Sequence, residues 1–437
     1  MRVTLSMLGL LLAAGFASAQ TPPADSPPAA SNGAPQMNRL DRMAILLDLT
    51  PQQKLQVQQV LDEERQQARV VKKTADALLV HDFAPLRGAT IEGTGRALPD
   101  HVLTNADFEK MVDTTDEWIV TRTGIRERRR IQPGDNNSDY AVRASQRALE
   151  AGGLTAQDVD HILIATVTPD RILPSMSCTV QNKLGATHAA CLDLNAACSG
   201  FLYGLQLAQS LIESGASDTV LLLGAETLTR ITDYEDRNTC VLFGDGAGAI
   251  VLRPCAPGTG VLSVRVGADG SQGDMLTIPA GGSERPASHE TVAARDHFIK
   301  MRGNELFKYA VRAMEQVSRD ALAEAGRDAA ELALLVPHQA NQRIIAAAAD
   351  RLGVGPEKVK TNIEHFGNTS AASIPILLDE VVGAGEVNER DLIELVAFGG
   401  GVTWGAAVVE WNPKAAVPLV PREARGRMGA VRSGAPA

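Results

Sequence analysis

The stretch Asn195-Ala196-Ala197-Cys198-Ser199-Gly200-Phe201 places a cysteine at the junction of two contrasting segments. A mostly apolar run, Ala189 to Leu194, leads into it, and a long low-charge pattern from Phe201 to Ser214 predicts a helix after it. The free amides and positive dipole end of a buried helix can lower the pKa of a thiol and make a cysteine nucleophilic. The simpler interpretation is that Cys198 is a small buried hydrophobic residue.

Two later segments favour the nucleophile. An apolar run ends in His338, ahead of a predicted helix from Ile344 to Leu352, and small polar residues around Asn368 precede another, Ile374 to Val382. Alone, the histidine would be a hydrogen-bonded structural residue and the asparagine a cap or turn residue. Together with Cys198 they supply a nucleophile, an imidazole and an amide donor, which acyl transfer with oxyanion or carbanion stabilisation requires.

Residues 87–411 resemble the β-ketoacyl-acyl carrier protein synthase III family, the initiating condensing enzymes of type II fatty acid synthesis. Asn368 is the third member of the set, as in these synthases, whereas elongating relatives resemble a Cys-His-His set and thiolases a Cys-His-Cys set. Plant-type polyketide synthases also use Cys-His-Asn, but the segments around Trp118 and Gly400 favour the fatty-acid branch. Besides the His338 and Asn368 segments, the matching motifs are, in family order, Gly93-Thr94-Gly95 with Leu98-Pro99, Asp116-Glu117-Trp118-Ile119-Val120-Thr121-Arg122-Thr123-Gly124-Ile125, Phe243-Gly244-Asp245-Gly246-Ala247-Gly248, Gly303-Asn304-Glu305, and Phe398-Gly399-Gly400-Gly401 with Thr403-Trp404-Gly405.

The resemblance implies an α/β protein with the duplicated five-layered thiolase-like fold, usually a homodimer. It implies condensation of an acyl-CoA primer with malonyl-acyl carrier protein, which gives 3-oxoacyl-acyl carrier protein, CoA and CO₂ by way of an acyl-Cys198. Cys198, His338 and Asn368 would be catalytic, and the backbone amides of Cys198 and Gly400 would form the oxyanion hole. No metal and no cofactor are expected. The acyl-CoA takes part as a substrate and is not counted as a cofactor.

The resemblance also suggests binding residues. Trp118 could stack on adenine and Arg122 could reach a phosphate at the CoA entrance, although both would also serve as a cap over the core. Asn304 and Phe307 resemble residues of the substrate tunnel. Leu173 stands where many relatives carry an aromatic residue facing the partner subunit's acyl pocket, so we expect a longer or branched primer to be admitted.

Composition limits the partners. A net charge of −10 over 437 residues argues against nonspecific nucleic-acid binding, and an acidic carrier protein therefore requires a local basic surface. Arg343 and Arg351 around the helix after His338 are candidates, the former also by resemblance. A second candidate cluster, which equally fits a solvated charged face, is Arg126, Arg128, Arg129 and Arg130. The five cysteines show no CxxC spacing, which predicts free thiols in a reducing compartment.

Strand-like and helical patterns alternate along the catalytic region, which predicts α/β layers. A weak internal repeat is visible, because a glycine-rich motif between two strands occurs around Asp245 and again around Gly400. The repeat predicts two halves, 87–255 and 256–411, with the site between them. The motif at Asp245 lacks the full dinucleotide fingerprint, so we interpret it as a tight turn that supports the site.

The two ends of the chain differ from the rest. Residues 1–19 have the pattern of a signal peptide, with an apolar run too short for a secure membrane helix, and residues 20–37 read as a disordered linker. Residues 38–80 predict a helical extension with a capping box from Thr50 to Gln53, faintly resembling Spy-type periplasmic chaperones. Residues 412–437 are expected to be a disordered tail.

The export-like start conflicts with the cytoplasmic location that the substrates imply. The sequence leaves three explanations: a natural fusion, a mistaken start site, or two adjacent genes joined, of which we favour the last two. Stable membrane insertion is not expected. Two other functions stay open: a synthase III-like acyltransferase of secondary metabolism, and a non-catalytic fusion.

Overall fold

The structure is a computed structural model that describes residues 50–53, 55–59 and 87–418. The chain divides into two units, Met1–Ala84 and Pro85–Ala437. In the first, residues 51–53 and 55–59 are helical, and the Thr50 amide donates to Gln53 Oε1 at 2.9 Å while the Gln53 amide donates to Thr50 Oγ1 at 3.3 Å. The predicted capping box is therefore confirmed. The predictions for residues 1–19 and 20–37, and most of 38–80, lie outside the described residues.

The first sheet of the second unit has five strands in the order β1-β7-β6-β4-β5. β4 runs parallel to β5 and β6, whereas β7 is antiparallel to both β6 and β1. All five strands come from the first predicted half: β1 (Gly88–Ala97), β4 (His161–Ala165), β5 (Ala190–Leu194), β6 (Val220–Thr227) and β7 (Asp245–Cys255).

The second sheet repeats this pattern with four strands in the order β11-β12-β13-β8. β11 is parallel to β12, and β13 is antiparallel to both β12 and β8, so the four correspond to β4, β6, β7 and β1. The strands are β8 (Val261–Ala268), β11 (Leu334–Pro337), β12 (Leu392–Gly399) and β13 (Thr403–Glu410). Two sheets with the same order and directions show that the fold is duplicated, as the sequence predicted.

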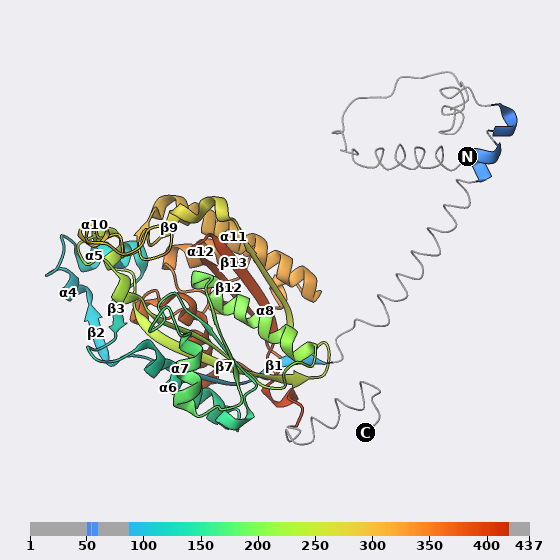
Figure 1. The fold of residues 1–437 in the computed structure, drawn as a ribbon, viewed down its shortest axis with the longest axis horizontal. Helices are drawn as coiled ribbons and strands as arrows, with labels where there is room; N and C mark the ends of the chain where they lie inside the picture. The colour runs from blue at the N-terminus through green and yellow to red at the C-terminus, as the bar shows by residue number, and fades with distance from the viewer. Residues whose placement is uncertain (1–49, 54, 60–86, 419–437) are drawn as a thin grey trace. The chain divides into compact units, whose positions relative to one another are not determined.

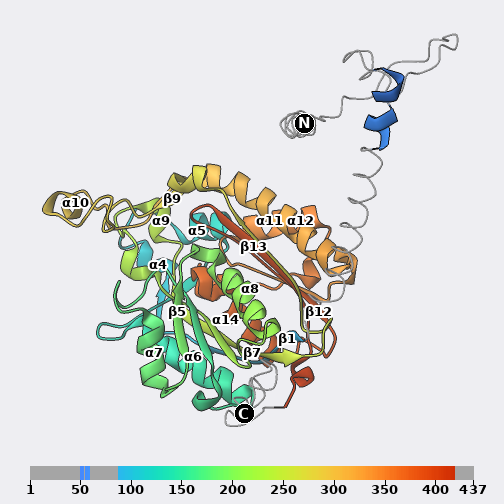
Figure 2. The ribbon, with the colours of Figure 1, turned by 45° about the vertical axis from the view of Figure 1, so that its right-hand side comes forward.

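Helices complete five layers (Figures 1 and 2). One pair covers the outer face of the first sheet, a second pair lies between the sheets, and a third covers the outer face of the second sheet. In that order the pairs are α6 (Asn137–Ala151) with α7 (Met176–Leu184), α8 (Gly200–Glu213) with α14 (Ser373–Gly383), and α11 (Gly303–Ala325) with α12 (Gln342–Leu352). The predicted thiolase-like fold class is confirmed.

The residue patterns explain the position of each helix. α8 and α14 are apolar around most of their circumference and carry no charged residue in their first turn, which suits helices packed between two sheets. The central cluster joins them, with Leu205 and Leu377 packed among strand residues such as Leu222 and Leu395. Each such side chain contributes about 2 kcal/mol on burial. α11 instead has one buried stripe and a charged outer face, as an outer helix should.

Shorter elements connect the layers and surround the site. Two of the 3-10 turns surround the site, η3 (Ala197–Ser199) and η8 (Ser370–Ala372), and a third, η9 (Pro413–Ala415), follows the last strand. The remaining short helices and strands are α4 (Asn105–Phe108), α5 (Asp116–Thr123), α9 (Arg237–Cys240), α10 (His289–Ala293), α13 (Ile363–Phe366), β2 (His101–Thr104), β3 (Glu127–Arg130), β9 (Leu276–Thr277) and β10 (Lys300–Met301).

Two predictions require correction. Asn412 accepts a hydrogen bond from Thr90 through its carbonyl, and the Val417 amide donates to the Pro254 carbonyl at 2.8 Å. The chain is therefore ordered to residue 418, and only 419–437 of the predicted tail lie outside the described residues. Arg128 is fully buried, not part of a basic surface, because its guanidinium stacks on Phe108 and donates to Asn105 Oδ1 at 2.7 Å.

All five cysteines are free thiols, as predicted. Of the helices in the described part of the chain, none is long and apolar enough to cross a membrane.

Candidate active site

Cys198 lies in η3, between the buried sheet and the start of α8, at the strand-to-helix junction that the sequence predicted. Only 7% of the residue is exposed. The preceding Ala197 has a φ of 45°, a left-handed torsion that is strained for a residue with a Cβ. This sharp turn directs the thiol inward ahead of a fourteen-residue helix, whose N-terminal end favours negative charge.

The pKa of the Cys198 thiol moves opposite to the sequence expectation. Burial raises it to about 12, although a hydrogen bond with the Ser370 side chain acts to lower it and the nearby Glu226 acts to raise it. A buried thiol loses the hydration that a thiolate needs, and one helix end does not replace it. Cys198 is therefore a protonated thiol at neutral pH, and nucleophilic attack requires a proton acceptor.

A glycine loop from the second half of the chain packs against Cys198. A Cβ added to Gly399 would lie 2.6 Å from the Cys198 amide nitrogen, so only glycine permits this close approach. Gly400, the predicted oxyanion residue, follows it and lies against Leu276. Thr403 Oγ1 donates to the carbonyl of Ala196 at 2.9 Å, which fixes the glycine loop to the turn before Cys198.

His338 follows β11 directly and is buried. Its amide donates to the Val396 carbonyl at 2.7 Å, and its Nδ1 lies 2.6 Å from Ser373 Oγ. That hydroxyl accepts from the Gln339 amide, so we assign its hydrogen to the Nδ1 bond, which leaves the other ring nitrogen, Nε2, protonated. Burial lowers the pKa of His338 to about 3, so the ring is neutral and Nε2–H is a hydrogen-bond donor without a protein partner.

Asn368 is held on both sides. Its amide donates to the Leu242 carbonyl at 2.9 Å, and the Gly244 amide donates to the Asn368 carbonyl at 3.0 Å. Its side-chain Oδ1 accepts from the Ser370 amide at 2.8 Å, which leaves the Nδ2 group available as a donor. The glycine-rich motif around Gly244 therefore supports the site.

Asp245 in that motif accepts hydrogen bonds from the Ile131 amide and from the amide and hydroxyl of Thr229. Its carboxylate is fully buried, and burial raises its pKa to about 6. A carboxylate with these three internal donors is a structural anchor, which agrees with the interpretation of the motif as a supporting turn.

One six-residue segment, 368–373, contains one of the three predicted catalytic residues and contacts the other two. It contains Asn368, the Ser370 side chain that bonds the Cys198 thiol, and the Ser373 hydroxyl that bonds His338. Packing contacts also join η8 to η3. The structure therefore brings the three predicted residues around one short connection, although they are 170 residues apart along the chain.

The predicted CoA entrance contains an aromatic side chain between two guanidinium groups. Trp118 on α5 is half-buried, with the Arg122 guanidinium carbon 5.0 Å from its ring centroid and that of Arg237 at 4.4 Å. Arg122 is exposed, as a phosphate-binding residue must be. Sequence reasoning missed Arg237. It is the first residue of α9, far from Trp118 in the sequence, and no motif around it indicates this contact.

The other predicted binding residues gather where α11 and α12 begin. Asn304 is exposed in the first turn of α11, and Phe307 is half-buried beneath the Arg343 guanidinium, 5.6 Å from the ring centroid. Arg343 is exposed at the start of α12. Arg351 at the other end of α12 pairs at 3.1 Å with Glu315, a carboxylate that Arg319 also contacts at 3.4 Å.

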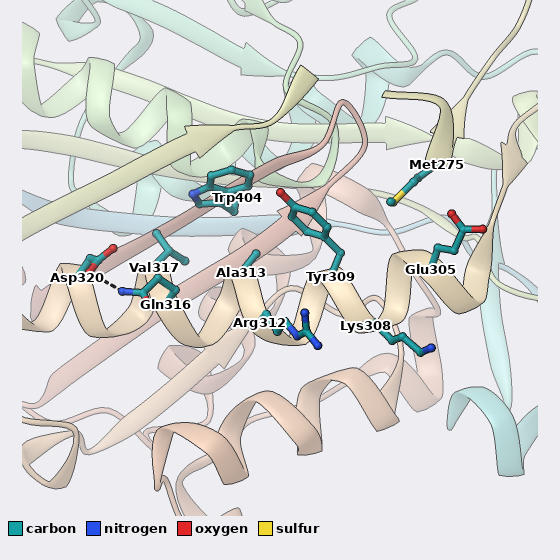
Figure 3. Close-up of a pocket in the computed structure, with 10 residues that line it drawn as sticks. All are labelled: Met275, Glu305, Lys308, Tyr309, Arg312, Ala313, Gln316, Val317, Asp320 and Trp404. Carbon is teal, nitrogen blue, oxygen red and sulfur yellow. Dashed lines mark hydrogen bonds between the residues drawn. The ribbon is translucent and has the colours of Figure 1, made fainter. Parts of the chain in front are cut away.

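A surface groove of about 590 Å³ lies beside these residues but contains none of the three predicted catalytic residues (Figure 3). It runs along α11, with Tyr309 and Trp404 side by side at 6.4 Å between ring centroids. Gln316 and Asp320 are hydrogen-bonded to each other at its edge. The groove is therefore a surface feature separate from the three predicted catalytic residues.

Leu173 is 84% exposed in the loop before α7, and its peptide bond to Pro174 is cis. In the part of the chain that the structure describes, no cluster of His, Cys, Asp or Glu side chains is arranged to hold a metal ion.

The duplicated sheets and the cysteine turn between them define a condensing acyltransferase with the thiolase fold. The family description 3-oxoacyl-[acyl-carrier-protein] synthase III matches residues 192–270, and its C-terminal counterpart matches residues 322–411. A β-ketoacyl-[acyl-carrier-protein] synthase III from Natranaerobius thermophilus is 49% identical over 329 residues, which are 75% of this chain and 100% of the relative. The chain belongs to the β-ketoacyl-acyl carrier protein synthase III family, the enzymes of the initiating condensation in fatty acid synthesis.

Solved structures agree. The synthase III from Aquifex aeolicus VF5 superimposes with a TM-score of 0.69 at 46% identity, covering 74% of this chain and 100% of its own. The priming β-ketosynthase from the R1128 polyketide pathway gives a TM-score of 0.70 at 35% identity, covering 75% and 97%. These relatives give no support to the signal-peptide interpretation or to the likeness of residues 38–80 to Spy-type chaperones.

Proposed function

We propose that Cys198 takes the acyl group from an acyl-CoA and that the acyl-enzyme is then condensed with malonyl-acyl carrier protein. The products are 3-oxoacyl-acyl carrier protein, CoA and CO₂. The observation that carries this proposal is the segment 368–373, which holds a carboxamide, bonds the imidazole of His338 and bonds the thiol of Cys198. A nucleophile and two neutral donors in one buried space suit acyl transfer followed by enolate formation.

In the first half-reaction, the sulfur of Cys198 attacks the thioester carbon and the negative charge moves to the carbonyl oxygen. The backbone amides of Cys198 and Gly400 stabilise this oxyanion. Contact between Gly399 and Cys198 supports the assignment, because it holds the glycine loop against the nucleophile. CoA leaves, and the acyl group stays on the cysteine.

In the second half-reaction, His338 Nε2–H and Asn368 Nδ2–H donate to the thioester carbonyl of the malonyl group. Loss of CO₂ places negative charge on that oxygen, and donors aimed at it stabilise the enolate before it attacks the acyl-cysteine. Removing one such donor typically costs about 3 kcal/mol. A neutral histidine suits this role, since its low pKa keeps Nε2 in the donor form across the physiological range.

The binding residues follow from the same reaction. Trp118, Arg122, Asn304 and Phe307 bind CoA and line its path, while Arg343, with Arg351 further along α12, receives the acidic carrier protein. No metal or cofactor takes part in these steps. We place the reaction in the cytoplasm, where its substrates are made. We also assign residues 87–255 to the first structural repeat and residues 256–411 to the second.

We further propose a homodimer formed through β5, the edge strand whose outer side has no neighbour in the first sheet. Exposed apolar side chains in the loop before α7, Ile172 at 91% and Leu173 at 84%, support it, because the Met176 amide at the start of α7 donates to Asp193 on β5. Leu173 would then face the partner's acyl pocket, and its smaller side chain would admit longer primers. Comparable acylation rates with acetyl-, isobutyryl- and octanoyl-CoA are expected. A strict preference for acetyl-CoA would contradict the proposal that Leu173 admits longer primers.

Intact-mass spectrometry tests the function as a whole. The wild-type protein should gain one acyl mass on exposure to acyl-CoA and lose it when malonyl-acyl carrier protein is added, with 3-oxoacyl carrier protein as the product. Cys198→Ser should gain no acyl mass. A wild-type protein that stays unmodified under these conditions would contradict the proposal.

A further inference from the structure

A buried carboxylate lies behind the nucleophile and has no role in the reaction as described so far. Glu226 is near the end of β6, the central strand of the first sheet, and is fully buried. Its charge acts on the Cys198 thiol. Sequence reasoning gave no sign of it, because Glu226 sits in an otherwise uncharged strand and faces partners that are far away in the chain.

The groups around Glu226 are arranged to donate to it. The Thr168 hydroxyl accepts from the Thr227 amide and therefore directs its own hydrogen to Glu226 Oε2 at 2.6 Å. Thr166 Oγ1 lies 3.2 Å from the same oxygen, and the Val167 amide donates to both oxygens at 3.1 to 3.2 Å. These donors are neutral, so they hold the carboxylate in place without quenching its charge.

Ser370 connects this carboxylate to the nucleophile. Ser370 begins η8, which packs against both β6 and η3, and its side chain acts on the Glu226 carboxyl on one side and on the Cys198 thiol on the other, lowering the pKa of each. It is 3% exposed, and its φ of 50° is left-handed, a torsion that glycine adopts far more readily.

The chemistry requires such a connection. The Cys198 thiol holds its proton at neutral pH, because burial raises its pKa to about 12. His338 is not the acceptor, since its Nδ1 is engaged by Ser373 and its Nε2 carries a hydrogen. The titratable group that faces Glu226 is the Cys198 thiol, and burial raises the pKa of Glu226 to about 7, where a carboxylate can accept and return a proton.

We propose that Ser370 and Glu226 form a proton relay that activates Cys198 in the acylation step, an inference that rests on the proposed function of Cys198. As the sulfur attacks the thioester carbon, the thiol proton passes to Ser370 Oγ, and the serine's own proton passes to the Glu226 carboxylate. When the carbon–sulfur bond to CoA breaks, the proton returns through Ser370 to the departing CoA sulfur. The carboxylate is regenerated, and one thioester has replaced another.

The relay is tested by the rate of acylation of Cys198, followed by rapid quench and intact mass from pH 6 to pH 10. In the wild type, the rate should rise with a midpoint near pH 7, as Glu226 loses its proton. Glu226→Gln and Ser370→Gly should acylate about 100-fold more slowly at pH 7, in the range typical of a lost general base. Both should recover by roughly tenfold per pH unit above pH 8, where hydroxide ionises the thiol.

Glu394→Gln is the matched control. Glu394 on β12 is also a fully buried glutamate whose pKa burial raises to about 7, but it lies next to Ser318 on α11. This control should keep the wild-type acylation rate and midpoint. Ser370→Gly serves as the second variant if Glu226→Gln fails to fold, because glycine accepts the left-handed torsion.

The outcomes separate the two proposals. Acylation of the wild type but not of Cys198→Ser, with Glu226→Gln and Ser370→Gly matching the wild-type profile, would overturn the relay and leave the proposed function intact. A uniform loss at every pH would also overturn it, since that indicates a structural role. Absence of acylation in the wild type would instead overturn the proposed function.

Discussion

Ala197 and Ser370 occupy equivalent points of the two repeats. Each begins a 3-10 turn before a central helix, and each has a left-handed torsion, with φ of 45° and 50°. Such a torsion costs a residue with a Cβ about 1–3 kcal/mol. The repeat therefore places its strain at the two turns that meet around the thiol, where it orients side chains.

Replacing Gly399 with alanine should inactivate the protein without unfolding it. The added Cβ would lie 2.6 Å from the Cys198 amide nitrogen, so the turn or the glycine loop must shift by several tenths of an ångström. Because catalysis depends on such small placements, we expect acylation to slow by about 100-fold. Stopped-flow or rapid-quench acylation measures it.

Gly383→Ala is the control for this substitution. Gly383 is the last residue of α14, and nothing lies within 4 Å of an added Cβ. It should keep the wild-type rate, and a wild-type rate in Gly399→Ala as well would contradict the close approach.

Cys198, His338 and Asn368 were predicted because each belongs to a continuous local motif. Glu226 and Ser373 were not predicted as functional, because their roles arise from contacts such as the 2.6 Å bond between His338 Nδ1 and Ser373 Oγ, made across 35 residues. The direction of the Cys198 pKa shift was wrong for the same reason. A helix start can be read from sequence, whereas the extent of burial depends on the whole fold.

The central helices and strands were predicted well because their apolar runs are long. The expected helix from Phe201 to Ser214 is α8, Gly200–Glu213, and the expected helix from Ile344 to Leu352 is α12, Gln342–Leu352. The basic run at β3 was harder to interpret. Its three arginines are consecutive, but side chains alternate between the two sides of a strand, and this places Arg128 in the core. Charge alone does not reveal which side of a strand faces inward.

The start of α12 should contribute more to carrier-protein binding than its end. Arg343 is exposed at the start, whereas Arg351 at the end is paired with Glu315. Arg343→Ala should raise the KM for malonyl-acyl carrier protein by about tenfold, a change typical of one charged contact, and leave the rate of acylation by acyl-CoA unchanged. Arg351→Ala, the matched control, should change KM by less than about twofold.

Steady-state kinetics at two salt concentrations would check this difference. The contribution of Arg343 should shrink as ionic strength rises. Equal effects of the two substitutions would count against docking at the start of α12.

The packing of β12 against α11 should make stability depend on pH. Burial raises the pKa of Glu394 from 4.5 to about 7, so the folded state holds this proton more tightly than the unfolded state. The stability that the protonated Glu394 carboxyl contributes is fully present below pH 4.5 and is lost as the pH rises through about 7. Glu394→Gln should therefore be more stable than the wild type at pH 9 by up to about 3 kcal/mol.

Urea unfolding at pH 4.5 and pH 9 measures this gain. Glu284→Gln, an exposed glutamate in a loop, is the control and should not change the pH dependence. A Glu394→Gln curve with the wild-type slope against pH would show that the carboxyl is not the cause.

At the scale of the molecule, β5 is an edge strand of the first sheet and carries an exposed apolar residue. Leu192 on β5 is 44% exposed, and Leu192→Lys should convert the proposed dimer to a monomer, because charged residues prevent pairing at a sheet edge. Val292→Lys is the control, since Val292 is 62% exposed on α10 instead. Light scattering after size-exclusion chromatography gives the mass; an unchanged dimer in Leu192→Lys would exclude this edge.

The protonated, buried state of Cys198 bears on survival under oxidative stress. Peroxides attack thiolates, and the resulting sulfinic and sulfonic acids are essentially irreversible lesions. A resting sulfur that keeps its hydrogen until substrate arrives is a poor target, whereas Cys178 is exposed at the surface. Peroxide should therefore oxidise the exposed Cys178 before it reaches the buried Cys198.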